Sequence, residues 1–370
     1  MLMKCLSSYT FNPLNTGRLR PVWAPLALLS VLLIGLLQPS TIRAQTRRTL
    51  NVDDAGTLVE QLTEDEANRI THLTLTGKLN AIDFRHLRDE FTSLQELDLS
   101  EATIKAYTGK NGTCQGDLTL YPAGIPAYAF CRRVNDSTLV GKPTLRRIVL
   151  PAKTKYIGEA AFAACEQLRI CQINRATPPE LYRDAMSTRH TAVFVPQGSL
   201  DAYRLKNRWA GFAFLEGEPV SATVQVGRLG SLADALTAQG LQPGQIHFLT
   251  VEGKLDEADF LLIRDYMPLL VEVDLTRTTA TTIPEFTFTQ KKYLLRIHLP
   301  AGLQTIGQRA FSGCVRLSGT LTLPPTVTAL ERGAFMNCDH LERVLVTGHA
   351  LTAVGENLFA GGNGTLVYGE

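Results

Sequence analysis

Short segments rich in leucine, isoleucine and valine recur along the chain, and each is followed by a turn and a phenylalanine. Because side chains alternate along a strand, every second residue of such a segment lies on the same face. The segments predict strands over residues 145–151, 294–300, 317–324 and 341–346. The phenylalanines at positions 288, 311, 335 and 359 give a repeat of about 23 to 24 residues.

The turn before each phenylalanine has a recurring sequence. Ile-Gly-Gln-Arg-Ala-Phe ends at Phe311, Leu-Glu-Arg-Gly-Ala-Phe at Phe335, and Ile-Gly-Glu-Ala-Ala-Phe at Phe162. A unit this small cannot bury its own apolar face, so neighbouring units must stack to form a core. We therefore predict an α/β repeat solenoid, with a parallel β-sheet on one face and short helical or irregular arcs on the other.

A longer internal similarity indicates two modules. Residues 72–100 align without gaps with residues 248–276, and 13 of the 29 positions are identical. Upstream, residues 56–62 and 230–236 each predict a short amphipathic helix that caps a module.

Two charged pairs recur in the duplicated segment. Asp83 with Arg88 in the first copy corresponds to Asp259 with Arg264 in the second. A pair of this kind could be functional, but we interpret it as a helix cap or a cap-to-sheet ion pair, repeated because the cap is repeated.

The end of the first module is predicted from a strand and a helix. Residues 193–195 read as its last strand, and Ser199 as the N-cap of a helix that covers the open end. Residues 216–220 are a plausible linker, and residues 365–370 predict a closing strand for the second module. The predicted domains are residues 45–219 and 220–370.

The first 44 residues predict a signal peptide. Basic residues precede an apolar run from Trp23 to Leu37, and the residues that follow suit a signal peptidase, so we place cleavage between Ala44 and Gln45. An uncleaved anchor is the alternative, although this run is shorter than the ~20 residues of a spanning helix. Cleavage predicts an exported protein.

The charge of the mature chain argues against nucleic-acid binding. The full sequence has 37 basic and 35 acidic residues. Removing residues 1–44 takes away four basic residues and no acidic one, which leaves a net charge of about −2. This charge lacks the basic excess of a nucleic-acid binder.

Six cysteines remain after cleavage, and three of them share one repeat position. Cys165, Cys314 and Cys338 each follow a phenylalanine by three residues, which predicts a ladder of small buried side chains. A disulfide between Cys314 and Cys338 would need suitable Cβ directions. If any pair forms a disulfide, we expect Cys114 with Cys131, because the irregular segment around them has no regular ladder to hold it.

The sequence has no motif of a known catalytic or metal site. None of the seven histidines lies in a His-Glu-x-x-His motif or beside a Cys-x-x-Cys pair. A Gly-x-Ser-x-Gly elbow, a phosphate-binding loop and a dinucleotide fingerprint are also missing from the sequence. We therefore predict no enzyme, no cofactor and no metal.

Strand alternation selects candidates for protein binding. The residues beside each inward aliphatic side chain point out from the sheet, and arginine and aromatic residues dominate protein-binding hot spots. This reasoning selects Arg147 and Phe194 in the first module, and Arg296, His298 and Arg343 in the second. The alternative is an ordinary solvated sheet face.

These features together resemble a known repeat family. The strand ending in Leu-Pro, the Ile-Gly-x-x-Ala-Phe turn and the cysteine after it resemble BspA-type leucine-rich repeats of exported bacterial proteins. Residues 195–204 resemble an end cap of that family, and the Gly-Lys-Leu-x-x-x-Asp-Phe segments resemble its N-terminal region. The resemblance covers nearly all of residues 50–360.

The resemblance implies two tandem leucine-rich-repeat modules, a location outside the cell or on its surface, and a role in adhesion. The partner would be a protein: a host matrix or serum protein, or a surface protein of a host or neighbouring cell. It implies no catalytic residue, and contact with a membrane only through export or anchoring. The alternative is a periplasmic or envelope scaffold, and an exported enzyme is the third interpretation.

Overall fold

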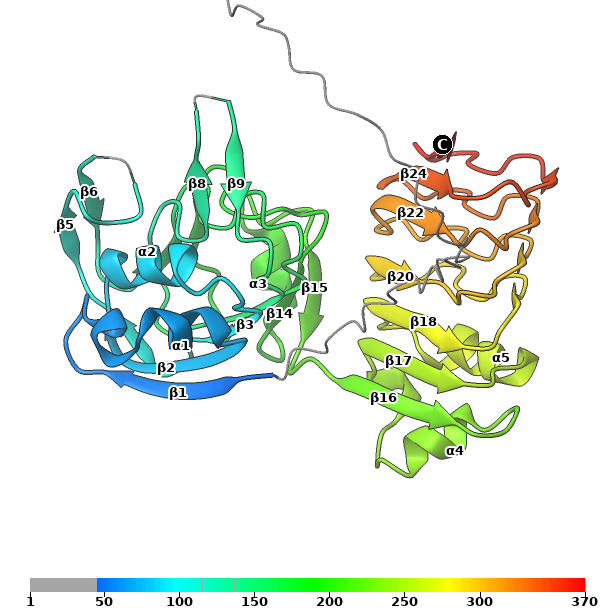
Figure 1. Ribbon diagram of the computed structural model, residues 1–370, viewed down its shortest axis with the longest axis horizontal. Helices are drawn as coiled ribbons and strands as arrows, with labels where there is room; N and C mark the ends of the chain where they lie inside the picture. The colour runs from blue at the N-terminus through cyan, green and yellow to red at the C-terminus, as the bar shows by residue number, and fades with distance from the viewer. Residues whose placement is uncertain (1–44, 115, 136, 370) are drawn as a thin grey trace, which may run out of the picture. The chain divides into compact units, whose positions relative to one another are not determined.

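Parallel strands from successive repeats form the main sheet of the first repeat array (Figure 1). The computed structural model describes residues 45–114, 116–135 and 137–369, so the predicted signal peptide over residues 1–44 lies outside the described residues. The eight-stranded sheet has the order β1-β2-β3-β10-β12-β14-β15, and β4 also pairs with β2. Its strands are β1 Arg47–Val52, β2 His72–Leu79, β3 Glu96–Asp98, β4 Ala102–Ile104, β10 Arg147–Leu150, β12 Ile170–Ile173, β14 Ala192–Val195 and β15 Ala213–Glu216.

Shorter strands complete the first array. A narrow parallel sheet has the order β13-β11-β7, and two antiparallel hairpins pair β5 with β6 and β8 with β9. The bounds are β5 Tyr107–Gly109, β6 Leu118–Leu120, β7 Gly124–Ile125, β8 Cys131–Arg133, β9 Leu139–Gly141, β11 Tyr156–Ile157 and β13 Glu180–Leu181. Both hairpins lie in the irregular segment between β4 and β10.

The second array repeats this plan. Its longer strands form the sheets β16-β17-β18-β20 and β22-β24-β26. Its two-residue strands form a third parallel sheet in the order β19-β21-β23-β25. The bounds are β16 Ser221–Val226, β17 Phe248–Gly253, β18 Glu272–Thr278, β19 Thr282–Ile283, β20 Arg296–His298, β21 Thr305–Ile306, β22 Gly319–Leu323, β23 Ala329–Leu330, β24 Leu341–Val346, β25 Ala353–Val354 and β26 Thr365–Tyr368. The predicted closing strand is therefore present as β26.

Five α-helices and two 3₁₀ helices lie in the described part of the chain, mostly near the start of each array. They are η1 Leu58–Gln61, α1 Glu64–Arg69, α2 Ala81–Asp89, α3 Leu200–Leu205, α4 Leu232–Thr237, η2 Pro243–Gln245 and α5 Glu257–Tyr266. The first predicted cap helix forms only the 3₁₀ turn η1, whereas the second forms α4. Within the helical residues, the first copy has β-branched Val59 where the second has Ala233, and a β-branched residue lowers helix propensity.

In five of the repeats the phenylalanine lies between two residues with left-handed backbone, each two positions away: Phe162, Phe288, Phe311, Phe335 and Phe359. Arg309 and Gly313 flank Phe311 with φ angles of 52° and 74°. Left-handed backbone is uncommon for a residue such as arginine, so the next repeat must hold it in place. The Arg309 and Phe311 amides donate to carbonyls of the following repeat at 3.1 and 2.8 Å.

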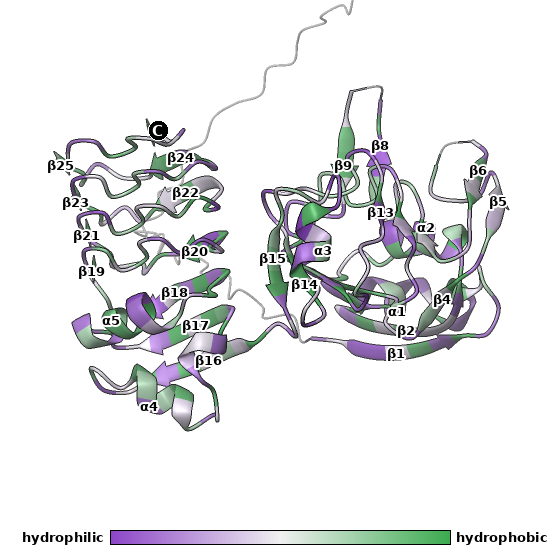
Figure 2. Ribbon diagram, turned by 180° about the vertical axis from the view of Figure 1, so that it is seen from behind, coloured by the Kyte–Doolittle hydropathy of each residue, from purple (hydrophilic) through white to green (hydrophobic). Residues whose placement is uncertain are grey.

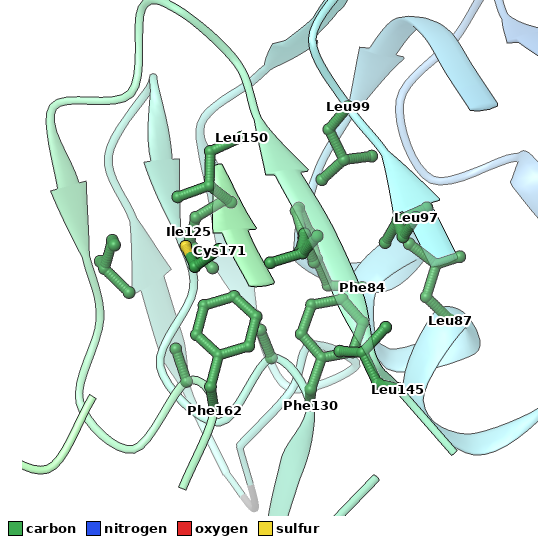
Figure 3. Close-up of a cluster of buried hydrophobic side chains, with 14 of the residues drawn as sticks. Phe84, Leu87, Leu97, Leu99, Ile125, Phe130, Leu145, Leu150, Phe162 and Cys171 are labelled. Carbon is green, nitrogen blue, oxygen red and sulfur yellow. The ribbon is translucent and has the colours of Figure 1, made fainter. Parts of the chain in front are cut away.

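Stacked phenylalanines form the centre of both arrays. In the second array, Phe288, Phe311, Phe335 and Phe359 stack with ring centroids 5.1, 5.4 and 5.8 Å apart. In the first, Phe130 and Phe162 stack at 5.3 Å, and Phe84 meets Phe130 edge-on (Figure 3). The repeated phenylalanine is thus the core side chain of each repeat.

The buried side chains form two large clusters and a small third one. One large cluster runs from Val52 to Phe214 and the other from Ala222 to Leu358. By its contacts, however, the chain from Gln45 to Glu370 is one compact unit. The domain boundary between residues 219 and 220 stays a prediction.

The end of the first array differs in part from the prediction. Ser199 does precede helix α3, but its side chain makes no cap hydrogen bond. The strand expected to be last, β14, is followed after α3 by the further strand β15, so that prediction was wrong. Tyr203 of α3 packs on Trp209 and Phe214, and this aromatic group joins the helix to β15.

Candidate functional site

Arg147 lies where alternation predicts, on the outer side of β10. It is half-buried, and its Nη2 donates to Gln172 Oε1 on the neighbouring strand at 2.9 Å. Its buried Nε has no hydrogen-bond partner among the described residues. The side chain lines a cavity of about 560 Å³ with Glu96, Arg169 and His298. Arg147 therefore lines the cavity, but its partnerless donor is buried beneath the cavity wall.

Phe194 is not available for binding, and its expected exposure was wrong. Its side chain is 0% exposed and belongs to the third cluster, with Leu215, Val271 and Leu295. The His247 ring meets it edge-on at 5.0 Å. Strand alternation correctly predicts the side of β14 on which Phe194 lies, because its side chain points away from the core of the first array. Other residues, however, cover that outer side of β14. Figure 2 accordingly shows β14 and β15 as hydrophobic along most of their length.

His298 belongs to a small, mostly buried charge cluster. Its Nε2 lies 3.1 Å from Glu272 Oε1, and Arg169 Nη1 lies 2.6 Å from the same oxygen. The Arg169 and Glu272 side chains are 18% and 13% exposed. Burial lowers the pKa of Arg169, and the Glu272 carboxylate opposes this shift. Glu272 is thus the residue that positions His298.

Arg296 is held by backbone and side-chain acceptors. Its Nη2 donates to the Glu166 carbonyl, and its Nη1 lies 3.4 Å from Gln167 Oε1. Burial lowers the pKa of Arg296, and neighbouring Arg169 adds to the shift. Removing this side chain would therefore disturb packing as well as any ligand contact.

Arg343 is the exposed member of the predicted set. It lies in β24 beside Thr320 of β22, and no polar partner for its side chain is found in the described part of the chain. Arg296, His298 and Arg343 line one cavity of about 800 Å³, whose wall also includes Arg189, His190 and Glu342. The structure therefore brings three of the five predicted residues together.

The repeated aspartates are helix caps, as interpreted, but they do not pair with the repeated arginines. Asp83 is fully buried and accepts from the backbone amides of Gly56, Asn80 and Leu58 at 2.7, 2.8 and 3.1 Å. Asp259 makes the same three contacts in the second copy, at 2.9 to 3.2 Å. The expected ion pairs were wrong, because Arg88 pairs with Asp89 and Arg264 with Asp265.

Two buried lysines were missed by sequence reasoning. Lys142 Nζ donates to the carbonyl of Arg88 at the end of α2, and Lys291 Nζ donates to the carbonyls of Arg264 and Met267 at the end of α5. Burial lowers the pKa of each to about 8. Both stand three residues before a leucine, Leu145 or Leu294, that precedes the first residue of β10 or β20 by two positions. That shared spacing is the signal in the sequence from which the two lysines could have been found. Each lysine caps the C-terminal end of a helix.

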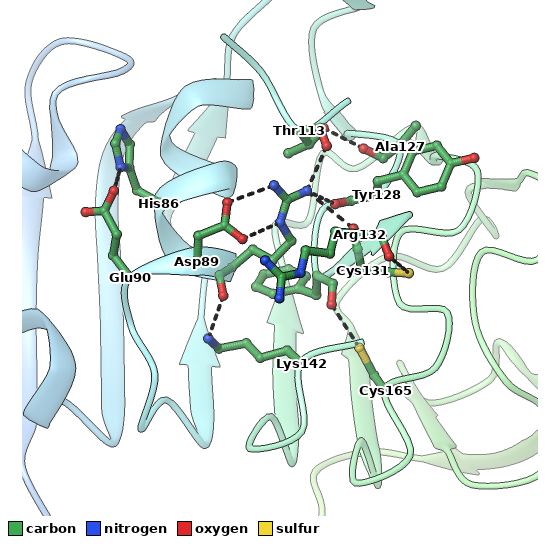
Figure 4. Close-up of polar contacts among 12 residues, drawn as sticks. His86, Asp89, Glu90, Thr113, Ala127, Tyr128, Cys131, Arg132, Lys142 and Cys165 are labelled. Atoms are coloured by element: carbon green, nitrogen blue, oxygen red, sulfur yellow. Dashed lines mark hydrogen bonds and ion pairs between the residues drawn. The ribbon is translucent and has the colours of Figure 1, made fainter. Parts of the chain in front are cut away.

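The irregular segment of the first array is held by Arg88 rather than by a disulfide. Arg88 Nη1 donates to the carbonyls of Thr113, Tyr128 and Cys131 at 2.7, 3.0 and 3.3 Å (Figure 4). Cys114 and Cys131, the pair expected first, are both free thiols. A buried guanidinium with three carbonyl acceptors supplies the cross-links that the sequence prediction assigned to sulfur.

The described residues contain neither a metal-binding cluster nor a membrane-spanning helix. Among them, no group of three or more His, Cys, Asp or Glu side chains is placed to hold a metal ion. In the same residues, no helix is both long enough and apolar enough to cross a membrane.

The repeats match a family model. Six copies of the BspA type leucine rich repeat region match residues 131–187 and 270–366. The chain carries BspA-type leucine-rich repeats. The predicted family and the predicted α/β repeat solenoid are confirmed. The N-terminal cap and the segment that joins the arrays lie outside the matched residues.

Solved leucine-rich-repeat structures align with the chain at low similarity. A protein from Bacteroides ovatus is 11% identical, with 82% of this chain and 85% of that chain covered and a TM-score of 0.26. The pneumococcal vaccine antigen PcpA is 15% identical over 81% of this chain and 62% of that chain, with a TM-score of 0.26. A Eubacterium ventriosum protein is 15% identical, with coverages of 81% and 84% and a TM-score of 0.25. No curated protein matches the chain.

In the BspA-type repeats, the recurring cysteine links each turn to the one before it. The Sγ atoms of Cys165, Cys314 and Cys338 donate to the carbonyls of Phe130, Phe288 and Phe311 at 3.3, 3.0 and 3.1 Å. All three are free, and burial raises the pKa of Cys165 and Cys338 to about 12. The predicted ladder of small buried side chains is therefore present, with a hydrogen bond at each step.

Proposed function

We propose that this chain is an exported bacterial protein that binds other proteins through the cavity lined by Arg296, His298 and Arg343. The observation that carries the proposal is the convergence of these three residues on one cavity of about 800 Å³. The repeat family supports it, because stacked repeats offer extended surfaces for binding. The role proposed is binding rather than catalysis.

Arg343 is the residue we expect to contact the partner most directly. It is exposed and has no polar partner in the described residues, whereas Arg296 and His298 already contact Glu166 and Glu272. An arginine with free donors can form a bidentate contact with a carboxylate, and arginine is enriched in binding hot spots. An acidic site on the partner protein would therefore suit this wall of the cavity.

We expect Arg343→Ala to weaken binding at least about tenfold, the usual loss for a charged hot-spot contact. The measurement is surface plasmon resonance against a panel of purified matrix and serum proteins, followed by the variant on each protein that binds. The matched control is Arg332→Ala, since Arg332 is also exposed but does not line the cavity. Equal affinity of Arg343→Ala and the unchanged protein would refute the role of this cavity.

The proposed location has its own test. We expect mass spectrometry of the protein from the producing cell to find an N-terminus at Gln45, and trypsin added to intact cells to remove the protein or the medium to contain it. A mature chain that trypsin cannot reach in intact cells would favour the periplasmic scaffold instead. A chain that still carries residues 1–44 would contradict the predicted cleavage.

A further inference from the structure

A second cavity lies beside helix α2, within the first array. It measures about 560 Å³ and is lined by Arg85, Arg88 and Asp89 of α2, by residues of the 110–114 segment, and by Tyr128, Arg132 and Arg133. We call it the α2 pocket. Five of its lining side chains are cationic and one is acidic. This local excess contrasts with the whole chain, whose formal net charge is only +2.

One of these cations is explained by the fold. Arg88 is 10% exposed, pairs with Asp89 at 2.8 Å and holds three carbonyls of the irregular segment. Asp89, the acidic residue of the pocket, is therefore already paired. Burial alone would raise the pKa of Asp89, but its hydrogen bonds from Arg88 and the nearby charges of Arg132 and Arg85 hold that pKa below its usual value. Figure 4 shows Arg132 reaching back toward Asp89.

The other four cations have no carboxylate partner of their own. In the described residues, no ion pair is formed by Arg85, Lys110, Arg132 or Arg133. Arg133 donates to Tyr128 Oη at 2.6 Å and lies over its ring, so this cation is fixed at the pocket wall by a neutral group. Like charges held close together repel one another, and an anion between them would remove that cost.

The second copy of the cap provides an internal comparison. Its Arg264 and Asp265 repeat the pair of Arg88 and Asp89, and Lys291 repeats the helix cap of Lys142. Leu261, however, occupies the position of Arg85, and no hairpin brings a counterpart of Arg132. The unpaired cations are therefore not required by the cap itself, which forms without them in the second copy.

We infer that the α2 pocket binds a small organic molecule through a tetrahedral oxyanion, either a phosphate ester or a sulfate ester. Unpaired cations from three segments surround the pocket, and a tetrahedral group offers three terminal oxygens where a carboxylate offers two. A volume of about 560 Å³ exceeds that of the anion alone and lies in the usual range for small organic ligands. This site is separate from the proposed protein-binding cavity and does not depend on it.

The test is isothermal titration calorimetry of the intact protein with glucose 6-phosphate, glucosamine 6-sulfate and glucuronate in dilute chloride buffer. We expect one saturable site for at least one of the two esters, and the ester that binds identifies which oxyanion the pocket takes. The double variant Arg85→Ala with Arg132→Ala should weaken that binding at least about tenfold, because it removes two charge-assisted contacts. Arg88 is left in place because it holds the irregular segment.

Two controls make the result decisive. Arg332→Ala removes an exposed arginine outside the pocket and should leave the affinity for the ester unchanged. The thermal midpoint of the double variant without ligand should stay the same or rise, since like charges are removed, which shows that the variant is folded. Glucuronate binding as tightly as the esters, no saturable site for either ester, or unchanged affinity in the folded double variant would each overturn the inference.

Discussion

Phe311→Ala is expected to lower the free energy of unfolding by about 3 to 5 kcal/mol, the usual cost of deleting a fully buried phenylalanine ring. Phe311 is 0% exposed and stacks on Phe288 and Phe335, so its removal leaves a cavity between two neighbours. The left-handed backbone on either side of the ring restricts how far the turn can collapse into that space. Urea unfolding followed by circular dichroism measures the loss.

Phe359→Ala is the matched comparison for this prediction. Phe359 occupies the same repeat position, but it is only partly buried and has one stacking neighbour, Phe335. We expect Phe359→Ala to lower the free energy of unfolding about half as much as Phe311→Ala, since the Phe359 ring buries roughly half as much surface. Equal losses for the two variants would show that the stacked rings do not determine the stability of the array.

Asp83→Ala is expected to lower the free energy of unfolding by a similar amount, about 3 to 5 kcal/mol, but by a different mechanism. The substitution removes one acceptor and leaves the amides of Gly56, Leu58 and Asn80 without a partner; for the two buried ones, Leu58 and Asn80, the cost is about 1 to 3 kcal/mol each before relaxation. The cap formed by η1 and α2 should loosen first. Hydrogen exchange of these three amides, measured by NMR or mass spectrometry, should become faster.

The control for Asp83→Ala is Asp54→Ala in the same cap. The Asp54 side chain is 86% exposed and lies 3.9 Å from Lys78, so we expect a change below about 0.5 kcal/mol. Asp83→Asn, which keeps one acceptor oxygen, should fall between the two. If Asp83→Ala exchanged these amides no faster than the unchanged protein, the three hydrogen bonds would not hold the cap.

The repeat architecture could be predicted because its signal is local and repeated. The spacing of the phenylalanines and the cysteine three residues later specify one turn, and each further copy makes the pattern more certain. The partners of Asp83 could not be predicted in the same way. Two of the three amides that it binds lie 25 and 27 residues earlier in the chain, and no local pattern encodes that distance.

Phe194 shows where alternation reaches its limit. Alternation states which side of a strand a residue occupies, but not whether another part of the chain covers that side. The segment Ala192-Val-Phe-Val carried the missing signal, because a continuous apolar run is typical of strands buried on both faces. Arg147 begins a strand whose other residues are apolar and buried, yet it is itself half-buried and pairs with Glu96 of β3.

Hydrogen bonding between turns also suggests an order of assembly. The Phe288, Phe311 and Phe335 amides each donate to a carbonyl of the turn that follows, while the cysteines donate to the turn that precedes. A newly formed turn therefore ends with an unmet donor that only its successor can satisfy. For a chain that emerges N-terminus first, each folded turn is a template that recruits the next.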